Sequence, residues 1–149
     1  QGSLVYRQIT DDQGQKFPDF KNLSKKWSTG AEYIALYPNV LLGAHRDHAY
    51  AIILLPLSYS ETIENVHIYY SQPNTSSSLK KKNKDQWKEV FEEDIFVVEG
   101  MQAGRLGIKF DGGRFSPKMD EPTHCFHDWV ASKVNDFRNN NHQITNVTE

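Results

Sequence analysis

The stretch that decides the fold is Trp87-Lys88-Glu89-Val90-Phe91-Glu92-Glu93-Asp94-Ile95-Phe96-Val97-Val98-Glu99-Gly100-Met101. Its apolar residues recur at three- and four-residue spacing, which predicts an amphipathic helix with Asp94 in the middle of the apolar face. A carboxylate taken out of water without a partner costs several kcal/mol. Asp94 is therefore expected to be protonated, paired with a cation or bound to a metal. The pattern alone leaves pairing with an arginine or with backbone donors open.

The residues before this stretch set the expected start of the helix. The polar segment from Ser71 to Leu79 predicts a loop, and the basic run from Lys80 to Lys84 continues it. Asn83 fits an N-cap with Gln86 at the N3 position, the arrangement of a capping box. The helix is therefore expected to run from about Lys84 to Ala103.

Segments of β character precede the helix. A first strand is expected at Leu4 to Ile9, with turn chemistry at Asp11 to Gln15. Phe17 to Gly30 predicts a surface loop with room for one helical turn. Hairpin-length links separate three more segments rich in Tyr, Ile, Val and Leu, which predict an antiparallel meander: Ala31 to Ala44, Ala49 to Leu57, and Thr62 to Ser71.

A second helix is expected after an irregular, glycine-rich crossing. Asp120 or Glu121 followed by Pro122 is a typical helix start. Apolar residues then recur at helical spacing at Phe126, Trp129, Val130, Val134 and Phe137. The asparagine-rich tail, residues 138–149, is expected to fray, which leaves about 1–137 as the ordered part.

Composition excludes several function classes. A length of 149 residues suits one domain, and 17 basic against 19 acidic residues give no positive field for nucleic acid. No apolar run approaches the ~20 residues that span a bilayer, so no membrane partner is expected. Cys125 is the only cysteine, which excludes a disulfide framework or an iron–sulfur site made by this chain alone and favours a cytoplasmic location. The start at Gln1 indicates a piece of a longer protein.

Three separated motifs, in the right order over positions 31 to 137, resemble one family. The first surrounds the helix carboxylate, and consists of Glu93-Asp94, Glu99, Gln102 and Gly104. The second is downstream, and consists of Gly112-Gly113-Arg114-Phe115-Ser116-Pro117, then Glu121, His124, Phe126, His127 and Trp129. The third is upstream, and consists of Tyr33, Tyr37-Pro38-Asn39, Pro56 and Thr62. Together they resemble the alpha subunits of Rieske non-heme iron ring-hydroxylating oxygenases.

The resemblance implies an α+β fold of the helix-grip (START-like) type, in which a long C-terminal helix packs on a curved antiparallel sheet. That fold agrees with the order of elements read from the residues. Residues 1–149 would be the C-terminal part of the catalytic domain, and therefore an incomplete domain. The chain has neither a Cys/His cluster motif nor the pair of histidines with four intervening residues that precedes the sheet in the family. The Rieske domain is thus expected to be absent from this chain.

The resemblance also implies the cofactors and partners. The family holds mononuclear Fe(II) with two histidines and one carboxylate, and Asp94 is the expected catalytic iron ligand. The histidine ligands and the Rieske domain with its 2Fe-2S cluster would come from upstream in the same polypeptide. Electrons would come from NAD(P)H through a reductase or ferredoxin, and the full protein would be a homotrimer. The isolated chain is expected to be inactive, with no iron bound.

The expected reaction is hydroxylation, dihydroxylation or demethylation of an aromatic or quaternary-amine substrate, and the sequence does not choose between these substrates. Apolar residues around Asp94 are expected to line the substrate pocket: Val90, Phe91, Ile95 and Val98. Glu99 and Gln102 would support the ligand. His45 and His48 flank Arg46-Asp47 in a polar hairpin turn, and His124 and His127 lie one helical turn apart; structural roles are expected for all four. The alternative function is a non-catalytic helix-grip module that binds a hydrophobic small molecule.

Overall fold

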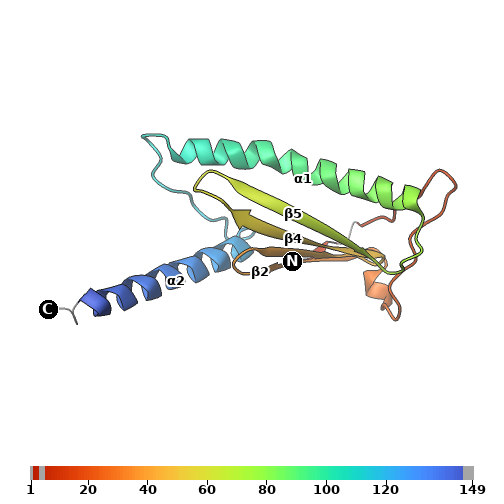
Figure 1. Cartoon of the computed structure of the whole chain (residues 1–149), viewed down its shortest axis with the longest axis horizontal. Coiled ribbons are helices and arrows are strands. Elements are labelled where there is room, and N and C mark those ends of the chain that lie inside the picture. The colour runs from red at the N-terminus through yellow and green to blue at the C-terminus, as the bar shows by residue number, and fades with distance from the viewer. Residues whose placement is uncertain (1, 4–5, 146–149) are drawn as a thin grey trace. The chain divides into compact units, whose positions relative to one another are not determined.

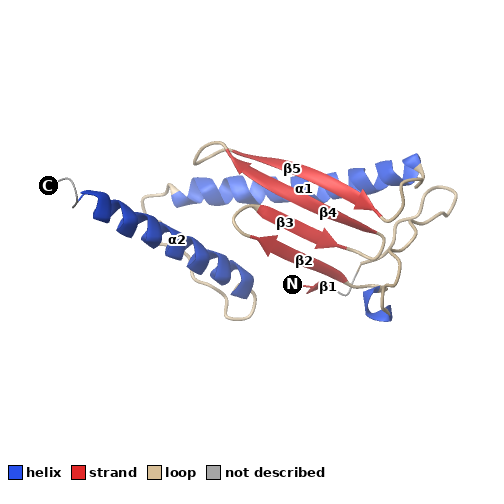
Figure 2. Cartoon of the chain, turned by 60° about the horizontal axis from the view of Figure 1, so that its bottom comes forward, coloured by secondary structure: helices blue, strands red, loops and turns tan. Residues whose placement is uncertain are grey.

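An antiparallel sheet forms the first of two compact units, residues 1–110, in a computed structural model that describes residues 2–3 and 6–145 (Figures 1 and 2). Its five strands are paired in chain order, each antiparallel to the next. They are β1 (Gly2–Ser3), β2 (Ala31–Leu36), β3 (Val40–Ala44), β4 (His48–Pro56) and β5 (Thr62–Tyr70). The predicted meander is confirmed.

A long helix, α1 (Ser77–Arg105), lies along one face of this sheet (Figure 2). Because side chains alternate along a strand, Tyr50 and Ile52 of β4 share that face, and both are buried. The ring of Tyr50 contacts those of Trp87 and Phe91, with centroids 4.7 and 5.4 Å away. The expected α+β class with an antiparallel sheet is confirmed, and the helix that packs on the sheet is α1.

The helix begins earlier than predicted, so the capping box at Asn83 is wrong. α1 starts at Ser77 and includes the lysine run. Asn83 is buried inside the helix, where its Oδ1 accepts a hydrogen bond from the Tyr70 hydroxyl at 3.2 Å. Lysine is a good helix former, and an ion pair between Lys81 and Asp85 supports the first turns. The basic run is therefore a helix surface rather than a linker.

Two strand predictions also need correction. The segment from Ala31 to Ala44 is not continuous, because Tyr37-Pro38-Asn39 forms a turn that separates β2 from β3. The Asn39 side chain donates to the Leu54 carbonyl at 2.9 Å, which ties this turn to β4. Residues 6–9 form no strand, and Leu4 and Val5 lie outside the described residues.

The turn at Asp11 to Gln15 and the single helical turn in the loop before β2 are as predicted. The Asp11 carboxylate accepts hydrogen bonds from the backbone N–H groups of Gln13 and Gln15 at 3.0 and 2.8 Å. Gly14 has a φ of 76°, the left-handed conformation that glycine adopts at little cost. One 3₁₀ turn, η1 (Lys25–Trp27), interrupts the loop before β2.

The second unit, residues 111–149, contains helix α2 (Glu121–Thr145). Its start is as predicted, and the Asp120 carboxylate accepts from the Ser116 backbone N–H at 2.6 Å. The helix continues to Thr145 instead of fraying from Arg138, because each asparagine costs a helix only a few tenths of a kcal/mol. Within the described residues, neither helix combines the length and apolar character needed to cross a membrane.

Gly43 gives a first testable prediction. It pairs with Tyr33 and Tyr50 in the sheet, and a Cβ added there would overlap the Tyr50 ring, which Trp87 and Phe91 hold in place. Gly43→Ala is expected to lower the free energy of unfolding by about 1–3 kcal/mol, measured by urea denaturation. Gly100→Ala is the matched control, since a Cβ there meets no atom within 4 Å and should stabilise α1. Equal stability of the two variants would contradict this packing.

Candidate functional site

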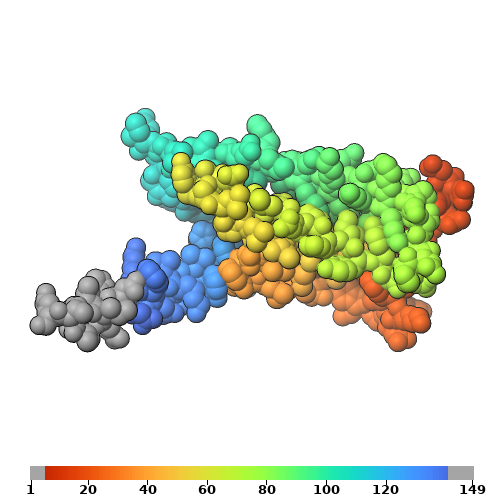
Figure 3. All heavy atoms as spheres, viewed as in Figure 1, coloured from red at the N-terminus to blue at the C-terminus, as the bar shows by residue number. Residues whose placement is uncertain are grey.

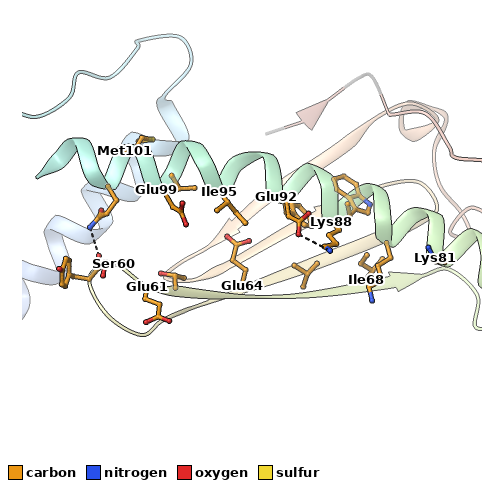
Figure 4. A pocket seen from close by; sticks show the side chains of 18 of the residues that line it. Ser60, Glu61, Glu64, Ile68, Lys81, Lys88, Glu92, Ile95, Glu99 and Met101 are labelled. Carbon is orange, nitrogen blue, oxygen red and sulfur yellow. Dashed lines mark hydrogen bonds and ion pairs between the residues drawn. The ribbon is translucent and has the colours of Figure 1, made fainter. Parts of the chain in front are cut away.

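A groove of about 1080 Å³ runs between β5 and α1 (Figure 4). In the space-filling view α1 lies along β5 (Figure 3). Val66 and Ile68 of β5 and Phe91 and Ile95 of α1 give it apolar walls. Charged side chains from α1, β5 and the turn before β5 also line it: Glu61, Glu64, Lys80, Lys81, Lys84, Lys88, Glu92, Glu99 and Arg105. Figure 4 shows Glu64 pointing from β5 toward α1, with Ile95 and Glu99 pointing toward the strand. The groove can therefore take an elongated molecule with apolar and charged parts.

Most of the residues expected to form the substrate pocket or to support the ligand line this groove. They are Phe91, Ile95, Val98, Glu99 and Gln102. Val90, the remaining expected pocket residue, does not line it. The Gln102 side chain donates to the Tyr59 carbonyl at 3.0 Å, so it holds the end of α1 to the β4–β5 turn.

Asp94 is exposed, which corrects the expectation that its helix face buries it. The face is open beyond Phe91, because Ile95 is 47 % exposed and Val98 is 59 % exposed. Asp94 also lies about 100° around the helix from Ile95, to one side of the groove. Among the described residues it has no hydrogen-bond or ion-pair partner. In this chain its carboxylate is therefore accessible to ligands.

The described residues do not form a complete metal site. Nowhere in the described part of the chain are three or more His, Cys, Asp or Glu side chains placed together so as to hold a metal ion. An Fe(II) facial triad needs two histidines beside its carboxylate. The described residues therefore do not supply such a triad by themselves.

A second cluster lies in the β3–β4 turn, where the sequence suggested an ordinary polar turn. Asp47 and His48 are fully buried, and His45 is 5 % exposed. The Tyr6 hydroxyl donates to the Asp47 carboxylate at 2.9 Å, and His48 Nδ1 lies 2.7 Å from the same oxygen. On its other side, His48 Nε2 accepts from the indole N–H of Trp87 at 2.8 Å. A continuous chain of hydrogen bonds thus joins the N-terminal loop, the sheet and α1.

The burial of His48 could be predicted in part from the sequence. A period of two places His48 on the same sheet face as Tyr50 and Ile52, which are core residues. No pattern in the sequence predicts the burial of Asp47. The adjacent Arg46, which sequence alone would offer as its ion-pair partner, is half-buried and pairs with Asp19 instead.

Burial and hydrogen bonding shift the pKa values in this cluster. Burial raises the pKa of the Tyr6 hydroxyl above its ordinary range, and the charge of Asp47 adds to the effect. Burial alone would raise the pKa of Asp47, yet the hydrogen bonds from His48 and Tyr6 lower it below its usual value. Burial and, to a smaller extent, a charge on His48 lower the pKa of His45 to about 4, against an opposing effect of the Asp47 charge. His45 is therefore neutral at pH 7.

The histidines of the second unit occupy the first turns of α2. His124 Nδ1 lies 3.3 Å from the Asp128 carboxylate, and the ring of Phe115 packs edge-on against His124 and His127. Cys125, between them, is exposed. These contacts tie the residues before α2 to its first turns.

Comparison with known proteins gives one match. The family model for the ring hydroxylating alpha subunit (catalytic domain) matches residues 6–136, which include the whole of β2 to β5, α1 and Asp94. No curated protein matches the chain. No solved structure matches it either.

Proposed function

Because the chain belongs to the family of ring-hydroxylating alpha-subunit catalytic domains, we propose that it carries the carboxylate iron ligand of a Rieske-type oxygenase. The enzyme would use mononuclear Fe(II) and dioxygen to hydroxylate, dihydroxylate or demethylate an organic substrate. The observation that carries this proposal is the family match across residues 6–136, within which α1 presents Asp94.

Asp94 is the proposed iron ligand. Its carboxylate is accessible and unpaired among the described residues, so two histidines from outside them can approach the same ion. Bound Fe(II) would supply the activation of dioxygen. The part of this chain would be to hold the carboxylate on a rigid helix, which the aromatic contacts of Trp87 and Phe91 fix to the sheet.

The groove between β5 and α1 is the proposed substrate site. Phe91, Ile95 and Val98 offer an apolar wall to an aromatic ring or an alkyl chain. Glu64 and Glu99 offer carboxylates to a cationic group such as a quaternary amine. Both substrate classes remain within the proposal.

The family also suggests the partners of the full enzyme. A 2Fe-2S cluster in a Rieske domain would deliver electrons that come from NAD(P)H through a reductase or ferredoxin. The histidine ligands and that domain would belong to the same polypeptide, and the enzyme would be a cytoplasmic homotrimer.

A second candidate function rests on the groove itself. Its size and apolar walls suit a hydrophobic small molecule, and the described residues lack a complete iron site. The chain would then be a binding module without catalysis.

Oxygen incorporation separates the two candidates. The protein that contains this chain together with its Rieske domain is loaded with Fe(II), reduced, and supplied with ¹⁸O₂ and a panel of aromatic and quaternary-amine compounds. The oxygenase proposal expects ¹⁸O in a product, or in the released aldehyde after a demethylation, and oxygen uptake that depends on the compound. Tight binding of a compound by the iron-loaded, reduced protein, without any oxygen uptake, would support the binding module and overturn the oxygenase.

A further inference from the structure

The hydrogen bond between Trp87 and His48 is one of the side-chain contacts that join the middle of α1 to the sheet, beside the ring contacts of Trp87 and Phe91 with Tyr50. Towards the start of the helix, Leu79 and Asn83 are buried, and Asn83 accepts from Tyr70 of β5. Trp87 follows Asn83 by one turn on the same ridge, and its indole reaches His48 at the start of β4. Beyond Phe91 the helix face is open. The Trp87 contact therefore helps to direct the open half of α1, whose far end the Gln102 hydrogen bond to the Tyr59 carbonyl holds to the β4–β5 turn.

The geometry fixes the protonation of His48. An indole N–H can only donate, so His48 Nε2 must carry a lone pair to accept it. The proton of the neutral ring is then on Nδ1, where it is donated to the Asp47 carboxylate at 2.7 Å. A doubly protonated His48 has no acceptor left for Trp87. The contact between helix and sheet thus requires a neutral His48.

The ring of His45 also disfavours a positive charge on His48. Its ring stacks on that of His48 with centroids 4.7 Å apart, and both of its nitrogens are buried without a hydrogen-bond partner among the described residues. Two charged rings in this stack would repel each other. The other groups around the pair come from the N-terminal loop, the turn, the strands and α1: Tyr6, Phe17, Asp47, Tyr33, Tyr50 and Trp87. Asp47 is the charged member, and its interactions with His48 and Tyr6 engage both of its oxygens.

We infer that the Trp87–His48 hydrogen bond is a positioning latch, which sets the rotation of α1 on the sheet while His48 is neutral and is released when His48 takes up a second proton. Seven residues separate Trp87 from Asp94, two helical turns along nearly the same ridge, so the latch also directs Asp94. Only the consequence for Asp94 rests on the proposed function.

Nuclear magnetic resonance of the ¹⁵N-labelled chain tests the latch without iron. The indole signal of Trp87 is assigned with Trp87→Phe, and its hydrogen exchange is followed from about pH 8 to about pH 4. At the high end we expect exchange at least ~10-fold slower than at Trp27, and a His48 ring protonated on Nδ1. At the low end of this pH range the protection should be lost while the amide signals of β3 to β5 persist.

Two substitutions at one position serve as matched variants. His48→Gln places an amide oxygen where Nε2 was, so it keeps an acceptor that does not titrate, and protection of the Trp87 indole should persist across the pH range. His48→Asn is too short to reach Trp87 and should lose protection at every pH. A His48 protonated on Nε2, or a His48→Gln variant that loses the protection in acid as the wild type does, would overturn the latch. Because no iron is involved, such a result would leave the oxygenase proposal standing.

Discussion

His45→Phe is expected to make the protein more stable, and the gain should grow as the pH falls. The two ring nitrogens of His45 are buried without partners, which costs about 1–3 kcal/mol that a phenyl ring of similar shape avoids. Tyr6, Tyr33 and Trp87 surround the position, so an aromatic replacement fits its neighbours. At pH 7 the variant should therefore unfold at a higher urea concentration than the wild type.

The acid part of this gain follows from proton linkage. The pKa of His45 is 6.5 when unperturbed and about 4 in the folded protein, because burial disfavours the charged ring. Above pH 6.5 the ring is neutral in both states and contributes nothing to the pH dependence. As the pH falls from 6.5 to 4 the unfolded chain binds a proton that the folded chain does not, so about 3 kcal/mol of stability is lost. His45→Phe should remove that loss.

Urea denaturation at several pH values measures this effect. His67→Phe is the control, since His67 lies exposed on β5 and its loss should leave the pH dependence unchanged. If His45→Phe loses stability between pH 6.5 and 4 as steeply as the wild type, His45 is not the group that resists protonation.

Asp94→Ala is expected to reduce turnover of the proposed oxygenase by about 1000-fold or more, because removal of the proposed metal ligand should cost more than the 10–100-fold typical of the groups that support ligands. Asp94 is exposed and has no partner among the described residues, so its removal should change the free energy of unfolding by no more than about 0.5 kcal/mol. A loss of activity could then not be attributed to unfolding. Steady-state oxygen uptake with a turned-over substrate, beside thermal unfolding of the same samples, measures both quantities.

Glu93→Ala provides the comparison for Asp94. Glu93 neighbours Asp94 on α1 and is also exposed, but it points another 100° around the helix. It should retain turnover within a few-fold of the wild type. Equal loss in both variants would indicate a general effect of charge on this helix, and not a ligand.

The larger elements could be predicted from the sequence because their signals are local. Richness in Tyr, Ile, Val and Leu predicted β4 and β5, and the spacing of apolar residues from Trp87 to Met101 predicted the body of α1. Helix boundaries depend on competing local choices. Asn83 carries a capping pattern, but burial against Tyr70 and good helix formers before it extend α1 to Ser77.

The site was less predictable, because it depends on contacts far apart in the sequence. A row of apolar residues on a helix does not predict which element packs on it. The helix face around Asp94 is open in this chain although its residues are apolar. Tyr6 and Asp47 are 41 positions apart, and His48 and Trp87 are 39 apart. No pattern in one segment predicts its contact with the other. The buried cluster therefore forms only when α1 packs on the sheet.

Iron content tests the account most directly. The full catalytic protein and its Asp94→Ala and Glu93→Ala variants are reconstituted with Fe(II) without oxygen, passed through a desalting column, and analysed for mononuclear iron separately from the 2Fe-2S cluster. We expect about one mononuclear iron per subunit in the wild type and in Glu93→Ala, and little or none in Asp94→Ala. Full mononuclear iron in Asp94→Ala, with the cluster intact in all three proteins, would contradict the assignment of Asp94 as the ligand.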